Sequence, residues 1–158
     1  MLATESTLDP RVTRLSTLDQ AAISDHFLRL DARSRYARFG NGVSDRFLNQ
    51  YSRRLLRLRG EIFGIFLTGE LRAVAEIREI LDDWPRTAEA ALSVEQNWQG
   101  RGLGNTLMFH IVGAARNYGT DFIHMMFSSN NSRMKSLTEK CNGEFEFVDS
   151  QILCTINL

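Results

Sequence analysis

The chain reads Trp98-Gln99-Gly100-Arg101-Gly102-Leu103-Gly104 between two segments of different pattern. The segment before it, 88–94, is typical of an extended strand, and the segment after it, 102–117, has apolar residues at helical spacing. A strand, a glycine-rich turn and a helix in this order place unpaired backbone N–H groups and the positive end of the helix dipole around one concavity. Such a place suits a phosphate or a pyrophosphate.

The spacing of the glycines excludes two common phosphate-binding motifs. A P-loop needs four residues between its glycines and then a lysine, and the chain has no such lysine here. A dinucleotide fingerprint needs Gly-x-Gly-x-x-Gly, whereas Gly100, Gly102 and Gly104 are each two residues apart. The remaining pattern is Gln-x-x-Gly-x-Gly, which begins at Gln99. An incidental glycine-rich turn before a surface helix remains the alternative.

The composition is that of an ordinary globular protein, with 158 residues that are 43% hydrophobic and 24% charged. Its formal net charge is zero, so it lacks the basic excess that nucleic-acid binding needs. No apolar run approaches the roughly 20 residues that span a bilayer. Cys141 and Cys154 are isolated thiols with no metal ligands nearby, as expected of reduced cysteines. We therefore expect a cytoplasmic protein with no nucleic-acid or membrane partner.

The hydrophobic periodicity predicts a single domain over residues 10–158, preceded by a loose arm at residues 1–9. Strands are expected at 11–15, 62–67, 71–78, 88–94, 122–127, 144–148 and 151–158. Helices are expected at 17–30, 44–55, 102–117 and 131–141. This order predicts an α/β domain with a mixed sheet.

Shorter signals predict how these elements are connected. Residues 31–35 have the composition of a polar turn, and Thr68-Gly69-Glu70 reads as the turn of a hairpin. A loop is expected at 81–86, and Gly119 stands where a helix stop is expected. Residues 122–127 are nearly all apolar, which predicts a strand buried on both faces.

The segment from Ala88 to Gly104 resembles the strand, loop and helix at the centre of the GCN5-related N-acetyltransferase (GNAT) family. The closest pattern is that of bacterial protein-lysine acetyltransferases, in which an Ala-Glu pair opens the strand and a Trp-Gln-Gly-Arg-Gly run forms the loop. Residues 26–28 and 34–39 are similar to the helix and turn of that branch, and residues 131–134 match its Asn-x-x-Met. The resemblance implies a mostly antiparallel sheet flanked by helices, in which two central strands, 88–94 and 122–127, splay apart.

The resemblance also implies a cosubstrate, which is acetyl-CoA or another acyl-CoA. The resemblance implies that the pantetheine arm pairs like an extra strand with the backbone around Val94. It also implies that main-chain N–H groups of residues 99–105 hold the pyrophosphate. Arg101 could add charge-assisted contacts or simply be solvated, and Asn131 could contact the arm, cap the last helix, or do both. The expected cofactor-binding residues are Val94, Gln99, Gly100, Arg101, Gly102, Leu103, Gly104, Asn105 and Asn131.

An amine must lose a proton before it can attack a thioester, so a base is needed near the sulfur. Glu89 is the expected base, because it opens the strand that leads to the loop and matches the glutamate of the resembling branch. A solvent-facing Glu89 is the alternative, in which case Glu76 is the reserve candidate; one of the two could pair with Arg78. The backbone N–H of Val94 is the expected donor to the tetrahedral oxyanion.

The chain departs from the family pattern at Thr138, where many members carry a tyrosine that protonates the departing thiolate. Water or Ser132 could replace it, the thiolate could leave unaided, or turnover could be slow. The two cysteines have no Cys–His–acid arrangement, so we expect direct transfer without an acyl-enzyme. His26, His110 and His124 show no metal-ligand spacing, and we expect structural roles for them and no metal site.

Two functions follow from these observations. The first is an N-acyltransferase that acts on a protein lysine or on a small-molecule amine. The second is an acyl-CoA-binding sensor or interaction module with weak or no catalysis, which the missing tyrosine favours. A domain that binds a nucleotide other than CoA is a third reading. The last hairpin offers strand edges that could join two copies of the chain.

Overall fold

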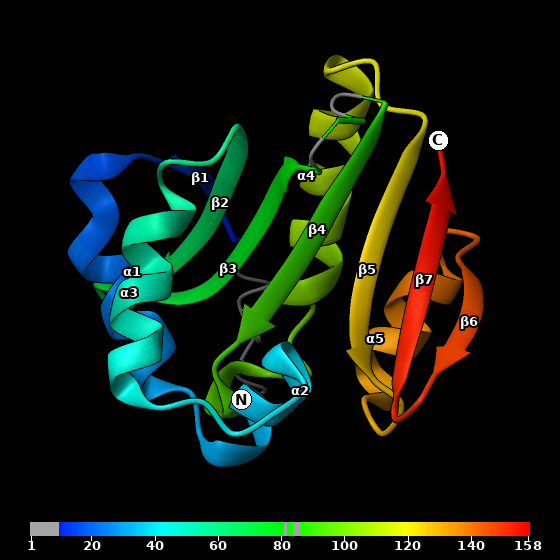
Figure 1. Cartoon of the computed structure of the whole chain (residues 1–158). Helices are drawn as coiled ribbons and strands as arrows, with labels where there is room; N and C mark the ends of the chain where they lie inside the picture. The colour runs from blue at the N-terminus through cyan, green and yellow to red at the C-terminus, as the bar shows by residue number, and fades with distance from the viewer. Residues whose placement is uncertain (1–9, 81, 84–85) are drawn as a thin grey trace, which may run out of the picture.

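The computed structural model describes residues 10–80, 82–83 and 86–158. The predicted arm at residues 1–9 lies outside the described residues, and so do Leu81, Trp84 and Pro85 of the predicted loop. The described residues form one open sheet with helices on both faces (Figure 1). The predicted fold class, an α/β domain with a mixed and mostly antiparallel sheet, is confirmed.

The sheet has the strand order β1-β2-β3-β4-β5-β7-β6. The strands are β1 (Val12–Leu15), β2 (Gly60–Leu67), β3 (Glu70–Glu79), β4 (Thr87–Val94), β5 (Phe122–Ser128), β6 (Glu144–Val148) and β7 (Gln151–Asn157). The β4–β5 pair is parallel, and the other described pairs are antiparallel. The predicted hairpin turn is present, with Thr68 and Gly69 both at positive φ, as a tight turn between twisted strands requires.

Among the described residues, five α-helices and two short 3-10 turns connect the strands. The helices are α1 (Gln20–Arg29), α2 (Ala32–Phe39), α3 (Asp45–Leu55), α4 (Leu103–Asn117) and α5 (Ser132–Glu139), and the turns are η1 (Thr17–Asp19) and η2 (Gln96–Trp98). Ser44 caps α3 by accepting the Phe47 N–H at 3.1 Å. Gly119 has a φ of +75° just beyond the end of α4, as a helix stop predicts.

Two apolar clusters fill the space between the sheet and the helices. The first cluster joins α1 and α3 to β2 and β3, and its fully buried members are Ile23, Phe27, Leu48 and Leu71. The second cluster joins α4 to the opposite face of β3, β4 and β5, and its most buried members include Ala75, Leu107, Ile111 and Ile123. The helices α1 and α3 therefore cover one face of the sheet, and α4 covers the other (Figure 1).

The prediction of a polar turn at residues 31–35 is wrong, because these residues begin helix α2. Asp31 caps this helix by accepting the Ser34 N–H at 2.8 Å. The helix has no buried residue, so it carries no apolar periodicity from which it could have been recognised. The Arg35 guanidinium holds it in place by donating to the carbonyl oxygens of Leu28 at 2.8 Å and Val43 at 3.2 Å.

The prediction that 122–127 is buried on both faces is also wrong. The side chains of Ile123, Met125 and Phe127 are buried, but Met126 on the other face is 44% exposed. The reason lies in the placement of the helices, because α1 and α3 pack over β2 and β3 and do not extend over β5 and β7 (Figure 1).

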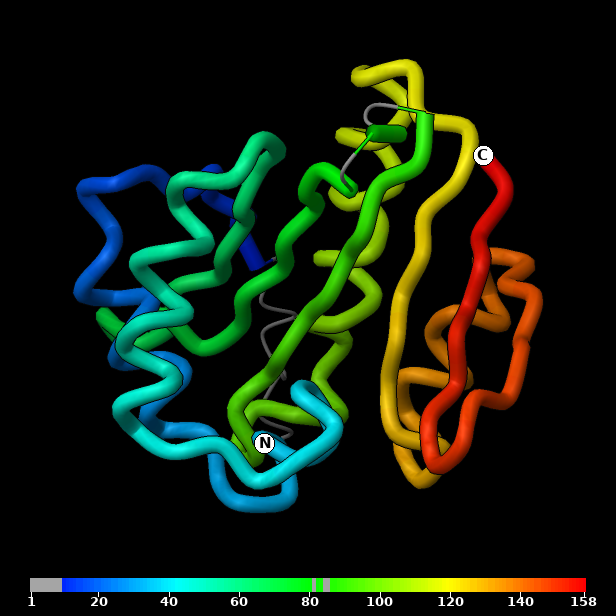
Figure 2. The backbone as a smooth tube through the Cα atoms, viewed as in Figure 1, coloured from blue at the N-terminus to red at the C-terminus, as the bar shows by residue number. Residues whose placement is uncertain are grey.

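The central strands β4 and β5 separate as predicted. They pair only from Thr87 to Glu89 with Phe122 to His124, and beyond this point they diverge (Figure 2). The Glu95 N–H donates to the Arg72 carbonyl at 3.0 Å, so alternation along β4 directs the backbone N–H and C=O groups of Ala90, Leu92 and Val94 away from β3. These groups therefore face the gap between β4 and β5.

Candidate active site

A groove of about 620 Å³ occupies the gap between β4 and β5. Residues 90–94 of β4 and 125–127 of β5 form its two sides. Helix α2 contacts both strands, and its residues Ser34, Ala37 and Arg38 also line the groove. The loop after β4 and the start of α5 complete the lining, so the groove runs from the sheet to the beginning of α4.

The N-terminus of α4 opens on this groove without a side-chain cap. Gly102 holds the N-cap position at a φ of +84°, and Gly100 has a φ of +75°, a conformation that L side chains rarely adopt. The first intrahelical bond is that of the Thr106 N–H to the Gly102 carbonyl, at 3.1 Å. The N–H groups of residues 103–105 precede it and have no acceptor within the helix, so they can serve an anion.

The groove brings together most of the residues expected to bind the cosubstrate. The lining includes Val94, Gln99, Gly100, Gly102, Leu103, Gly104, Asn105 and Asn131. Asn131 caps α5 by accepting the Met134 N–H at 3.1 Å, which confirms one of its two expected roles. Arg101 is not part of the lining, because its guanidinium lies 4.8 Å from the centre of the Trp98 ring and donates to the Asn97 carbonyl at 3.2 Å.

Four basic residues line the groove, namely Arg33 and Arg38 of α2 and Arg133 and Lys140 at α5, and none of them was among the residues expected to bind the cosubstrate. Arg133 and Lys140 lie at the two ends of α5 and both line the groove. Arg133 donates to the Gln99 side-chain oxygen at 2.8 Å, although the two residues are 34 positions apart. Arg133 lies within the Asn-x-x-Met motif at residues 131–134, but the resemblance to the family rests on the asparagine and the methionine of that motif. No local pattern in the sequence marks either residue as a groove residue.

Glu89 lies at the last residue pair between β4 and β5, where the strands begin to diverge. Its side chain is 44% exposed and pairs with Arg78, whose Nη2 lies 3.0 Å from Glu89 Oε1. The expected apolar setting is therefore absent, and Glu89 is not among the lining residues of the groove. The surroundings of Glu89 match the solvent-facing alternative, although the residue adjoins the mouth of the gap.

Glu76, the reserve candidate, is buried on the same face of the sheet. Its Oε1 accepts hydrogen bonds from Arg38 Nη2 at 2.7 Å and from the Tyr51 hydroxyl. Its Oε2 is buried and has no hydrogen-bond partner among the described residues. Burial and the adjacent carboxylate of Glu76 raise the pKa of Tyr51, so the phenol stays protonated and donates. We call Glu76, Arg38, Tyr51, Arg78 and Glu89 the Glu76 cluster.

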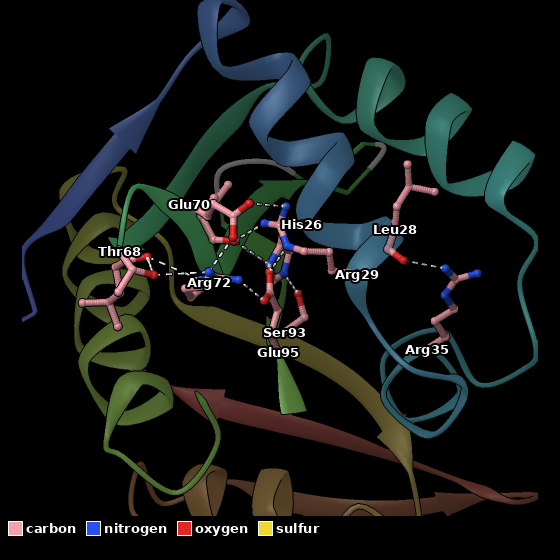
Figure 3. A network of polar contacts seen from close by, with 11 residues as sticks. His26, Leu28, Arg29, Arg35, Thr68, Glu70, Arg72, Ser93 and Glu95 are labelled. Atoms are coloured by element: carbon pink, nitrogen blue, oxygen red, sulfur yellow. Dashed lines mark hydrogen bonds and ion pairs between the residues drawn. The ribbon is translucent and has the colours of Figure 1, made fainter. Parts of the chain in front are cut away.

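A second buried carboxylate, Glu95, directly follows Val94. Its oxygens accept from Arg29 Nε at 2.8 Å and from Arg72 Nη1 at 2.9 Å, and His26 Nδ1 lies 3.4 Å away (Figure 3). Burial alone would raise the pKa of Glu95, but the hydrogen bonds from His26, Arg29 and Arg72 outweigh it and lower the pKa to about 2. We call these residues, together with Ser93, the Glu95 cluster.

His26 shows how the Glu95 cluster holds the end of β4. Burial lowers the pKa of His26, so the ring is neutral near pH 7. Its Nδ1 lies 3.2 Å from the Leu71 carbonyl and its Nε2 lies 2.8 Å from Ser93 Oγ. A proton on Nδ1 satisfies all these contacts, because Nδ1 then donates to the carbonyl and Nε2 accepts from the serine. The role of His26 is therefore structural, as expected.

Thr138, which replaces the family's tyrosine, does not reach the groove. Its side chain is fully buried, and its hydroxyl lies 2.9 Å from the Met134 carbonyl oxygen, to which it can donate within the helix. Ser132, the alternative donor, does line the groove. Of these two residues, only Ser132 could therefore donate to a ligand in the groove.

The structure of the chain is similar to solved structures of acetyltransferases. The chain superposes on the GNAT domain of S. lividans PAT with a TM-score of 0.82 and 20% identity, covering 94% of this chain and 90% of that chain. It is similar to yncA of Salmonella typhimurium, solved with its cofactor acetyl-CoA (TM-score 0.71, 17% identity, 95% and 93% covered). It is also similar to the ribosomal-protein-S18-alanine N-acetyltransferase of Escherichia coli (TM-score 0.67, 16% identity, 93% and 92% covered).

Among curated proteins, no sequence matches this chain. The described helices include none with the length and apolar character that crossing a bilayer requires. The family model of the acetyltransferase (GNAT) family, however, matches residues 25–143. That match confirms the predicted resemblance, the predicted enzyme class of N-acetyltransferase and acetyl-CoA as the acyl donor. The chain belongs to the acetyltransferase (GNAT) family.

Proposed function

We propose that the chain transfers an acetyl group from acetyl-CoA directly to a primary amine, either a protein lysine or a small-molecule amine. One observation carries this proposal: the gap between β4 and β5 is edged by backbone groups and continues into the uncapped N-terminus of α4. An extended arm with amide groups can pair with the edge of β4, as a further strand would. The pyrophosphate at the end of that arm fits the N–H groups of residues 99–105.

Glu89 is the proposed general base. It stands where β4 and β5 diverge, and its half-exposed carboxylate is reachable by an amine that arrives from solvent. The Arg78 guanidinium, 3.0 Å away, orients the carboxylate. Glu76 remains the second candidate, because one of its oxygens has no partner while its other oxygen is held by Arg38 and Tyr51. A base in either position takes the proton of the ammonium as the amine attacks the thioester carbonyl.

The backbone N–H of Val94 is the proposed donor to the oxyanion. The alternation along β4 directs this N–H into the gap, where an acyl group on the arm would lie. The thiolate of CoA leaves as the amide forms, and Ser132 or water supplies its proton, since Thr138 is buried. Burial raises the pKa of the Cys141 and Cys154 thiols, which makes them poor nucleophiles and favours direct transfer.

A weakly active acyl-CoA-binding module is the second candidate, and the burial of Thr138 is the observation that favours it. The two functions are separated by a binding and turnover experiment. Acetyl-CoA should raise the midpoint of thermal unfolding, and CoA thiol should be released only when an amine is added. The amine panel contains lysine peptides, N-terminal peptides and small amines, because solved structures of this fold differ in the acceptor that their names give. Binding without thiol release from any amine would support the sensor function.

We further propose that the chain forms a homodimer and that it is a cytoplasmic protein. The strands β1 and β6 form the two edges of the sheet, and pairing of one such edge with a second copy would give a dimer. Sedimentation velocity over a range of concentrations tests this. The free thiols Cys141 and Cys154 fit the cytoplasmic location expected from the sequence.

A further inference from the structure

A chain of polar side chains crosses the groove. Gln99 donates from its side-chain Nε2 to the Val94 carbonyl oxygen at 2.9 Å. Arg133 on α5 donates to the Gln99 side-chain oxygen at 2.8 Å. The Ser34 hydroxyl on α2 lies 3.4 Å from the same Gln99 nitrogen. All four residues line the groove, so this bridge joins β4, α2 and α5 across it.

The Gln99 amide occupies an acceptor that an extended ligand needs. The alternation along β4 directs the Val94 carbonyl into the gap, where an amide N–H of a pantetheine arm would meet it. Gln99 offers the same chemical group from its own side chain. The arm and the Gln99 side chain therefore compete for this oxygen, and we expect an arm that pairs with β4 to displace Gln99 from Val94.

The Gln99 amide oxygen is a weaker hydrogen-bond acceptor for Arg133 than a phosphate oxygen would be. The Arg133 guanidinium donates to a neutral amide oxygen, whereas a charged phosphate oxygen accepts a shorter and stronger hydrogen bond. The N–H groups that suit a pyrophosphate open on the same groove as Arg133. A ligand that carries phosphates thus gives Arg133 a better partner, and the Gln99 side chain is then released from one of its two anchors.

We propose that Gln99 and Arg133 make the enzyme select acyl donors that carry phosphates, namely acyl-CoA over phosphate-free thioesters of pantetheine. This inference rests on the proposed function of the groove. A phosphate-bearing donor replaces the bond of Arg133 as it displaces Gln99 from Val94. A phosphate-free donor displaces Gln99 and gives Arg133 nothing in return. Selection then comes from a bond that must be broken as well as from the contacts that are gained.

The test is a set of calorimetric titrations with CoA, 4′-phosphopantetheine and pantetheine, which need no acceptor amine. In Gln99→Ala we expect pantetheine to bind about fivefold more tightly, because no side chain competes for Val94, and CoA to change less. In Arg133→Ala we expect CoA and 4′-phosphopantetheine to bind about tenfold more weakly, and pantetheine to bind more tightly. Lys135→Ala removes the same charge from the same helix outside the groove, and it should change none of the three affinities.

A second variant, Gln99→Glu, should change the affinities for pantetheine and for CoA in opposite directions. Gln99→Glu cannot donate to Val94 but pairs more strongly with Arg133, so we expect pantetheine to bind more tightly and CoA more weakly than in the original chain. If Gln99→Ala instead weakens pantetheine and CoA alike, Gln99 holds the arm and the inference is wrong. It is equally wrong if Arg133→Ala leaves CoA binding unchanged. If the unaltered chain binds no CoA, the proposed function itself fails, and that result is distinct from the other two.

Discussion

The Glu76 and Glu95 clusters lie on the same face of the sheet, yet they differ in how completely their carboxylates are paired. Each oxygen of Glu95 accepts from a different arginine, and His26 lies beside one of them. In Glu76 one oxygen serves both Arg38 and Tyr51, and the other has no partner among the described residues. A fully paired buried network fixes a structure, whereas an unpaired buried oxygen needs an explanation, which is often functional. We therefore propose that the Glu95 cluster positions β4 and that the Glu76 cluster takes part in the chemistry.

The largest expected effect is on catalysis, in the Glu76 cluster. Glu89→Gln removes the proposed base but keeps a side chain that can pair with Arg78. We expect kcat to fall about a hundredfold or more, with the affinity for acetyl-CoA and the unfolding midpoint unchanged. Stopped-time assays of CoA thiol release measure kcat. Glu79→Gln is the matched control, since Glu79 is on the neighbouring strand but on the other face of the sheet.

The result for Glu89 also decides between the two candidate bases. If Glu89→Gln keeps full activity while Glu76→Gln loses it, the base is Glu76 and the buried cluster takes part in the chemistry directly. If neither variant loses activity, the assignment of chemistry to the Glu76 cluster is wrong.

The next effect is on stability, in the Glu95 cluster. Glu95→Gln leaves the guanidinium groups of Arg29 and Arg72 without their buried counter-charge. We expect the free energy of unfolding to fall by about 3 kcal/mol, as urea denaturation would measure. Glu61→Gln is the control, because its partner Arg14 is mostly exposed, and we expect a loss of less than about 0.5 kcal/mol. Equal losses in the two variants would show that the Glu95 cluster does not anchor β4.

The same cluster predicts a dependence of stability on pH. The pKa of Glu95 is about 2 in the folded chain, below its ordinary value of 4.5. A lowered carboxylate pKa adds stability above the unfolded value, and that stability is lost as the pH falls from about 4.5 towards 2. The difference in unfolding free energy between the original chain and Glu95→Gln should therefore be constant above about pH 5 and shrink below it. A constant difference down to pH 3 would contradict the low pKa.

The smallest effects come from removing one hydroxyl from each cluster. Tyr51→Phe removes a donor to Glu76, and Ser93→Ala removes the partner of His26 Nε2. We expect each to lower the free energy of unfolding by about 1 kcal/mol. We also expect Tyr51→Phe, but not Ser93→Ala, to shift the pH profile of kcat, because we propose a part in the chemistry for the Glu76 cluster alone. Equal shifts in both variants would remove the distinction between the clusters.

Most of the fold could be predicted because its signals are local. Apolar periodicity located the strands and the long helix, and single residues such as Ser44 and Gly119 located helix ends. Helix α2 was missed because it is held by Arg35 and by its cap rather than by an apolar face. The exposure of Met126 was missed because it depends on how far helices from another part of the chain extend over the sheet.

The site could be predicted where it is made of backbone, and much less where it is made of side-chain pairs. The loop glycines and the N-terminus of α4 follow from spacing, and the structure places them in the lining of the groove. Glu95 was not singled out, although it adjoins the motif, because its arginine partners lie 23 and 66 positions away. The bond between Arg133 and Gln99 is likewise a product of tertiary structure.

The way in which α2 is attached has a consequence for how such enzymes diversify. This helix lines the groove, yet none of its residues is buried, and Arg35 ties it to carbonyl oxygens on both of its flanks. We therefore expect α2 positions whose side chains are not buried and make no hydrogen bond to other described residues, such as Arg33 and Ala37, to tolerate exchange during evolution with little effect on folding. We propose that a lineage that keeps Arg35 and varies Arg33 and Ala37 changes which amine the groove accepts on an otherwise unchanged scaffold.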